Sequence, residues 1–255
     1  MTLGDVLTLL RESILNDRTD RVSGSSDYLW TDATLVTFID EAQRRFARKG
    51  LILRDASNDE ATKVVLKTGQ ILYPLHPSVI SVISAKRADD AADITRVGHT
   101  VFSAYRAPTE NWTDPASFNH FPDGPTLAVS TDEAVNDIDG DDFSQITLRV
   151  HPKPRLEENG KVIRLRVVRE PINELKHTAL SAQLEIPRSH QIEFLDWAAY
   201  LALRIVDDDA GAPRRAAEFA ASFEQHVKEA RTNAMRKMFA PSGWAFGRGG
   251  FSWSS

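Results

Sequence analysis

The sequence predicts an α+β protein. We expect a four-helix-type bundle from N- and C-terminal helices, an inserted antiparallel β domain and an extended C-terminal tail. Three observations predict this class: apolar residues recur at helical spacing near both ends, short β-rich runs fill the middle, and a Gly-, Trp- and Phe-rich stretch follows the last helix. Such an insertion is tolerated when its two ends lie close together. The expected parts are helices in 1–57, the inserted domain in 58–186, helices in 187–239 and the tail in 240–255.

Two helices are predicted before residue 58. The first covers about residues 2–16, where one face carries Leu3, Val6, Leu7, Leu10 and Ile14. A polar loop follows over 17–28. Thr31 is a suitable N-cap for the second helix, and Asp32 in the first turn favours the helix dipole. Gly50 is expected to end that helix.

The middle of the chain reads as β structure. Gly, Pro, Asn and Asp separate six β-rich runs, at 62–68, 78–87, 100–105, 126–130, 145–150 and 162–169. The last two runs are expected to be antiparallel neighbours joined by a loop over 152–160. A small sandwich or half-barrel follows from this pattern.

Helix returns after Pro187, a good residue for a first helical turn. The stretch that follows is apolar on two faces, so we expect it to be buried between partners. Asp207-Asp208-Asp209 and Pro213 end it. A last helix is predicted over 213–239, with small residues in its apolar seam that allow neighbouring helices to approach closely.

Composition excludes several functions. The chain has 255 residues, a net charge of −5 and no cysteine, so thiolate zinc sites and thiol nucleophiles are excluded. The histidines lack zinc-ligand spacing. The acidic run Asp137–Asp142 has Leu148 where a calcium loop needs Glu, so it is expected to be a solvated turn. We predict no cofactor, no metal, no catalysis and no membrane association for a protein made in the cytoplasm.

The C-terminal tail is the strongest candidate for an interaction site. Aromatic anchors beside arginine are typical of buried interface contacts, and the candidates are Phe239, Trp244, Phe246, Arg248, Phe251 and Trp253. Two other interpretations remain: a fold back over its own helices or a frayed end. A third is nucleic-acid binding, because 247–250 resembles one Arg-Gly-Gly element.

Two stretches resemble known proteins. The run 30–35 reads WTDATL and continues as IDEA at 39–42, and 186–198 reads IPRSHQIEFLDWA. Both are similar to stretches of tailed-phage head-to-tail adaptor proteins. The order helices, β insert, helices and tail is similar to the podophage adaptor, tail tubular protein A. The resemblance covers nearly the whole chain in layout and these two stretches in motif.

The resemblance implies a structural protein of the virion neck, synthesised in the host cytoplasm. It implies a ring of twelve copies between the portal protein and the tail nozzle or tubular protein, around the DNA channel. The aromatic tail would dock on the portal. Ring or bundle packing would use Trp30, Phe38, Phe194, Trp197 and Phe223. With −5 on each copy, an acidic lumen would enclose genomic DNA without sequence-specific binding.

Three alternatives stay open at this point. The basic aromatic tail is compatible with a nucleic-acid-binding module, for which binding would depend steeply on salt. A glycan hydrolase on the β insert would need a cleft with convergent carboxylates, which no pattern predicts. Another connector or nozzle protein of a long-tailed phage would share much of this layout.

Overall fold

The computed structural model describes residues 1–17, 28–89, 92–96, 126, 128–133, 146–205 and 212–239. The chain divides into two compact units. The first, which we call the helical unit, contains Met1–Ile52 and Asn173–Ser255. The second, which we call the sheet unit, contains Leu53–Ile172. The expected boundaries of the insert, 58 and 186, differ from these, because the segment after Ile172 packs within the helical unit.

The helical unit starts with a short helix that changes its winding. Thr2 and Asp5 form a capping box at the start of α1 (Leu3–Thr8). The chain then continues as a π-helix, Leu9–Leu15, which ends at Asn16 in the left-handed conformation, with φ of 55°. The predicted helix over 2–16 is therefore present, but only its first half is an α-helix.

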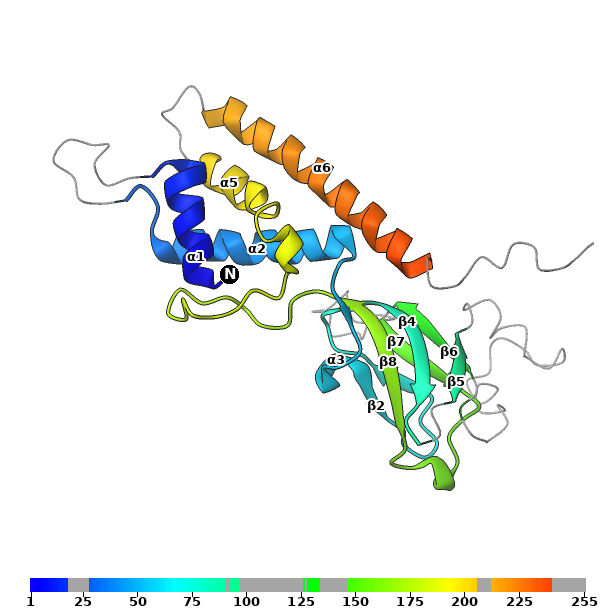
Figure 1. Ribbon diagram of the computed structural model, residues 1–255. Helices are drawn as coiled ribbons and strands as arrows, with labels where there is room; N and C mark the ends of the chain where they lie inside the picture. Colours follow the sequence, from blue (N-terminus) through cyan, green and yellow to red (C-terminus); the bar gives the residue numbers. More distant parts are fainter. Residues whose placement is uncertain are drawn as a thin grey trace, which may run out of the picture. The chain divides into compact units, whose positions relative to one another are not determined.

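Three longer helices complete the helical unit (Figure 1). They are α2 (Asp32–Gly50), α5 (Leu195–Leu203) and α6 (Ala212–Phe239). Thr31 is the N-cap of α2, as predicted, and its hydroxyl accepts a hydrogen bond from Thr34 N at 3.2 Å. The three helices pack on one another pairwise. The fully buried phenylalanines of this unit are Phe46 on α2, Phe223 on α6 and Phe194, the N-cap of α5.

An extended segment that was expected to belong to the β insert lies against α1. Leu3 N donates to Ala182 O at 2.9 Å, and Gly4 N donates to Leu180 O at 2.8 Å. These bonds satisfy backbone donors at the start of α1 that have no partner inside the helix. The segment therefore covers the N-terminal helix.

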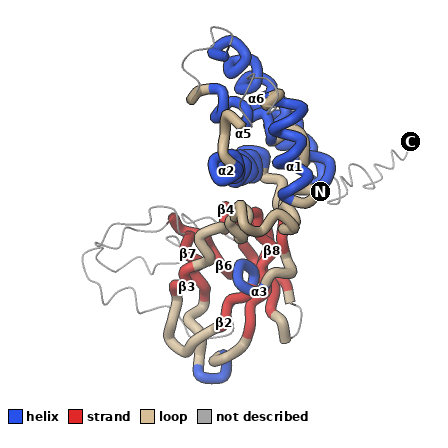
Figure 2. The backbone as a smooth tube through the Cα atoms, turned by 90° about the vertical axis from the view of Figure 1, so that its left-hand side faces the viewer, coloured by secondary structure: helices blue, strands red, loops and turns tan. Residues whose placement is uncertain are grey.

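The sheet unit is one curled eight-stranded sheet (Figures 1 and 2). Its strands follow the order β1-β8-β4-β5-β6-β7-β3, and β2 also pairs with β8. A short helix, α3 (Asp59–Thr62), lies between β1 and β2. The strands are β1 (Arg54–Asp55), β2 (Lys63–Val65), β3 (Leu72–Pro74), β4 (Val79–Arg87), β5 (Asp93–Arg96), β6 (Ala128–Glu133), β7 (Ile146–His151) and β8 (Val162–Arg169).

The core of the sheet unit lies on the inner face of the curl. In β8, Ile163, Leu165 and Val167 alternate with exposed arginines, so one face of the strand is apolar and the other is charged. The long β4 beside it contributes Val82 and Ala85 to the same core. This alternation sets which side chains of β8 face the core.

The predicted fold class was wrong. The described residues form a mixed α and β structure with five α-helices and a curled half-barrel, and they do not form a four-helix bundle with a small antiparallel insert. The first helix has only six α-helical residues, and α5 has nine. These two helices are too short to serve as two of the four helices of a bundle. The extended segment that contacts α1 covers part of the helical unit instead. The sheet is also not wholly antiparallel, because β5 and β6 run parallel.

The predicted pairing of the last two strands was also wrong. β7 pairs with β6 and β3, whereas β8 pairs with β4, β1 and β2. Neighbouring runs in a sequence suggest a hairpin, but β4 and β8 are the two longest strands and bury their apolar faces together. Three strands, β1, β3 and β5, were missed because two to four residues carry too little periodicity. The run predicted at 100–105 lies outside the described residues.

Candidate functional site

Helix α6 is the element that leads to the predicted docking tail. It has 28 residues and ends at Phe239, the first residue of the predicted docking set. The side chain of Phe239 lies outside the described part of the chain, as do Trp244, Phe246, Arg248, Phe251 and Trp253. The site that the structure describes is therefore α6 together with the side chains that hold it.

The inner face of α6 is a stripe of mostly small buried residues: Ala216, Phe223, Val227, Ala230 and Ala234. Their spacing places them on one side of the helix. Phe223 is the large side chain in this stripe. Its ring lies 5.8 Å from that of Phe46 on α2 and 5.2 Å from that of Trp197 on α5, measured between centroids. Aromatic contacts at these distances fix α6 against both helices.

Trp197 links this aromatic cluster to charged side chains. The Arg45 guanidinium lies 3.8 Å from the centroid of the Trp197 ring, a cation–π contact between α2 and α5. The Tyr200 ring also lies close to Trp197, with 4.5 Å between the two centroids. Within the described residues, the buried Nε atom of Arg45 and the indole nitrogen of Trp197 have no hydrogen-bond partner. The stacking contact, rather than hydrogen bonds, therefore positions the Arg45 guanidinium.

Polar contacts also tie α6 to its neighbours. Lys49 on α2 forms an ion pair with Glu224, and Asp196 on α5 lies 3.3 Å from His226 Nδ1. Burial raises the pKa of the Asp196 carboxyl, and contacts with Ser222 and His226 oppose that shift. Glu224 and His226 flank the apolar stripe, so these contacts add to its hold on α2 and α5.

The outer face of α6 is polar and carries a hollow near its C-terminal end. Both signs of charge line it, and the lining residues are Glu224, Gln225, Lys228, Glu229, Thr232, Asn233 and Arg236. Because Arg236 is only three residues before Phe239, this face lies at the start of the predicted docking tail. Such a face can form hydrogen bonds and ion pairs with another protein.

The five residues predicted to pack in a ring or bundle do not all lie together. Phe194 and Phe223 are fully buried, Trp30 is 7% exposed, and Phe38 and Trp197 are half-buried. The structure brings Trp197 and Phe223 together. Whether any of these side chains contacts another subunit stays a prediction. Phe46 belongs to the same cluster and was not among the five predicted residues.

Trp30 is held by a buried charge network that the sequence did not indicate. The Arg11 guanidinium, inside the π-helix, donates to Trp30 O at 2.8 Å and pairs with Asp32 at 2.8 Å. The Asp17 carboxylate accepts a hydrogen bond from Leu29 N at 2.9 Å. These contacts fix the start of α2 to the first helix. The sequence signal that could have indicated these contacts is the pair of charged residues, Arg11 and Asp17, beside the apolar stripe of the first helix.

Other sequence candidates have simple outcomes. The acidic runs 137–142 and 207–209 lie outside the described residues. Arg214 pairs with Glu218, and Arg215 donates to Ile14 O at 3.3 Å. His190 contacts Glu193 at 2.6 Å in the turn before α5. Among the described residues no cluster of His, Asp and Glu could hold a metal ion, and none of their helices has the length and apolarity to span a membrane.

Comparison with known proteins gives a family match over most of the chain. A protein-family model described as "SU10 adaptor protein" matches residues 1–243, which include both units of the chain. The matched range ends within the predicted docking tail. The sequence matched no curated protein.

Proposed function

This chain belongs to the SU10 adaptor protein family, a family of phage adaptors, and on that premise we propose that it joins the portal to the tail in a phage virion. The match over residues 1–243 is the observation that carries the proposal. An adaptor is a structural protein whose partners are other virion components. The proposed site of action is therefore the virion neck, after synthesis in the host cytoplasm.

The proposed assembly is a ring of twelve copies around the DNA channel, in the arrangement implied by the layout of tail tubular protein A. Side-to-side contacts between copies are heterologous, and they close only when the rotation per subunit is right. The polar outer face of α6 supports this proposal, because it leaves charged groups at the surface of the helical unit. The sheet unit would face the tail nozzle or tubular protein.

The tail over residues 240–255 would dock on the portal. Its aromatic side chains and Arg248 are the residue types that dominate the binding energy of interfaces. Helix α6 supports this role because its inner face is anchored at Phe223 by two aromatic contacts. A firmly held helix lowers the ordering cost of placing the tail on a partner.

Removing the tail aromatics tests this function. We expect a variant with Trp244, Phe246, Phe251 and Trp253 changed to Ala to fold normally and to lose attachment to purified portal rings. Co-sedimentation and electron micrographs of portal rings would measure attachment. A matched control changes Ser242, Ser252 and Ser254 to Ala in the same tail, and it should still attach. Unchanged decoration of portal rings by the aromatic variant would show that docking does not use the tail.

A further inference from the structure

Two neighbouring apolar side chains are exposed just before α2. Tyr28 is 47% exposed and Leu29 is 63% exposed, whereas Trp30, the next residue, is only 7% exposed. Apolar residues that are scattered singly over a surface are normal, but contiguous ones are typical of contact sites. We call Tyr28 and Leu29 the apolar knob.

Buried charged residues hold the apolar knob in place. The Asp17 carboxylate accepts hydrogen bonds from Leu29 N at 2.9 Å and from Trp30 N at 3.5 Å. The Arg11 guanidinium donates to Trp30 O at 2.8 Å and lies 3.8 Å from the centroid of the Tyr28 ring. A segment that is fixed before binding loses less conformational freedom when a partner covers it. The apolar knob is therefore preorganised for a contact.

The size of the apolar knob indicates the kind of interface. Two side chains bury a few hundred Å² at most, whereas an independent stable interface needs about 1,000 Å². The knob by itself would therefore not hold two free chains together. It suits a contact that is repeated around an assembly, where several weak contacts act together.

A surface of suitable chemistry lies on α6. The hollow on the outer face of this helix is lined in part by Lys228, Glu229, Asn233 and Arg236. The hydrocarbon stems of lysine and arginine can cover an apolar side chain while their charged ends stay in water. A guanidinium also packs favourably on a tyrosine ring, and an amide or carboxylate oxygen can accept a hydrogen bond from the phenol.

The knob and the hollow of one chain lie far apart. Arg215, near the start of α6, donates to Ile14 O at 3.3 Å, so α6 starts beside the end of the π-helix (Figure 1). Asp17, which holds the knob, directly follows that end. Roughly 25 Å of helix then separates Arg215 from Thr232 in the hollow. A second chain is therefore needed to bring a knob to a hollow.

We propose that the apolar knob of one copy inserts into the α6 hollow of the next copy. This contact joins two different surfaces, so it is heterologous and can close into a ring. The inference rests on the proposed ring and specifies which residues join neighbouring copies. The predicted docking tail takes no part in this contact.

Cysteine pairing tests the contact, because the chain has no cysteine of its own. The test variant carries Leu29→Cys and Asn233→Cys, both at exposed positions. Mild oxidation of the concentrated free chain traps weak contacts, and a non-reducing gel should show a ladder of linked copies. In the matched control, Leu29→Cys is combined with Ala221→Cys, an exposed position roughly 18 Å back along α6. It should give at least about fivefold less product, since a disulfide needs close Cα atoms.

Two further variants make the test specific. Adding Tyr28→Ala to the test pair should reduce the ladder about fivefold, because the tyrosine anchors the contact. Leu29→Cys alone should give no more dimer than Glu41→Cys, an exposed position on α2. A strong dimer of Leu29→Cys alone would indicate pairing of two knobs and would overturn the proposal.

The remaining outcomes separate this contact from portal docking. Equal ladders from the test and control pairs would overturn the proposal, as would the absence of linked copies both in the free chain and on portal rings. A ladder in the free chain without attachment to portal rings would support the knob contact and contradict portal docking. Attachment without a ladder would do the reverse.

Discussion

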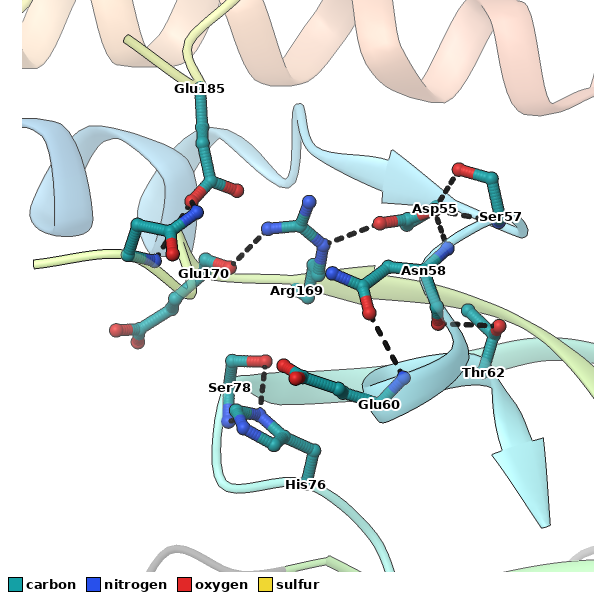
Figure 3. A network of polar contacts seen from close by, with 11 residues as sticks. Asp55, Ser57, Asn58, Glu60, Thr62, His76, Ser78, Arg169, Glu170 and Glu185 are labelled. Carbon is teal, nitrogen blue, oxygen red and sulfur yellow. Dashed lines mark hydrogen bonds and ion pairs between the residues drawn. The ribbon is translucent and has the colours of Figure 1, made fainter. Parts of the chain in front are cut away.

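Asp55 is the most highly coordinated carboxylate that the structure describes in the sheet unit (Figure 3). Its oxygens accept hydrogen bonds from Arg169 Nε at 2.7 Å, Ser57 N at 2.8 Å and Asn58 N at 3.1 Å. The same guanidinium donates to Glu170 O at 2.9 Å. The side chains of Asp55 and Arg169 are 9% and 12% exposed. This buried pair joins β1 to the end of β8.

The environment of Asp55 makes it sensitive to acid. Burial by itself raises the pKa of this carboxyl, but the hydrogen bonds from Ser57, Arg169 and Asn58 outweigh burial and hold the pKa well below its usual range. A folded-state pKa below the unfolded value means that ionised Asp55 stabilises the fold above about pH 4. That contribution falls as the pH drops through the folded-state pKa.

We predict that Asp55→Asn lowers the free energy of unfolding by about 3 kcal/mol at pH 7, because it leaves the buried Arg169 charge without its carboxylate. Urea unfolding followed by circular dichroism measures this change. The difference from wild type should shrink as the pH falls below about 4. Asp59→Asn, at an exposed carboxylate in the same unit, should stay close to wild type. A difference that is constant from pH 7 to pH 2 would contradict this account of Asp55.

At the scale of elements, the end of α2 depends on a close approach between helices. Gly50 is its last residue, and a Cβ atom added there would lie 3.2 Å from Ile52 Cγ2 and 3.7 Å from Ala230 Cβ on α6. The left-handed residue that ends the helix is Leu51, with φ of 52°. The sequence correctly indicates a stop at Gly50, but the glycine is there for space rather than for a positive φ.

We predict that Gly50→Val destabilises the helical unit by about 2 kcal/mol. The added side chain would push both Ile52 and α6 away from residue 50. Thermal or urea unfolding followed by circular dichroism measures the change. Glu41→Val is the matched control, since Glu41 is exposed on the same helix. Its cost should be about 0.5 kcal/mol, from helix propensity alone. Equal costs for the two variants would show that α6 does not need the glycine.

At the scale of the whole molecule, the proposed ring would have to form from surfaces that the isolated chain exposes to water. The polar outer face of α6 is such a surface. The net charge of −5 on each copy nevertheless opposes self-association of the free chain. Heterologous contacts of this kind leave open ends until the last copy is added. The portal would remove this problem by holding the copies in register.

We therefore predict that the purified chain is a monomer and that it assembles only on the portal. Size-exclusion chromatography with light scattering measures the mass of the free protein. Addition of portal rings should shift the chain into the portal peak. A stable dodecamer in the absence of portal would contradict templated assembly while leaving the family assignment intact.

The sequence by itself determined those elements whose formation depends on residues close together in the chain. The strand predicted at 162–169 is β8, and the helix predicted at 213–239 begins one residue earlier as α6. The Thr31 cap was also predicted correctly. Caps, turn residues and apolar periodicity act over a few residues. They can therefore be recognised without knowing what packs against them.

The tertiary structure decided which segments meet. The pairing of β4 with β8, the parallel β5 and β6, and the extended cover on α1 join segments that the sequence does not link. The same is true of the Asp55–Arg169 pair and of the aromatic contact of Phe46 with Phe223. Each of these depends on burial and charge shared between distant segments. These pairings are set by the free energy of the whole folded chain, and a local sequence pattern does not contain that information.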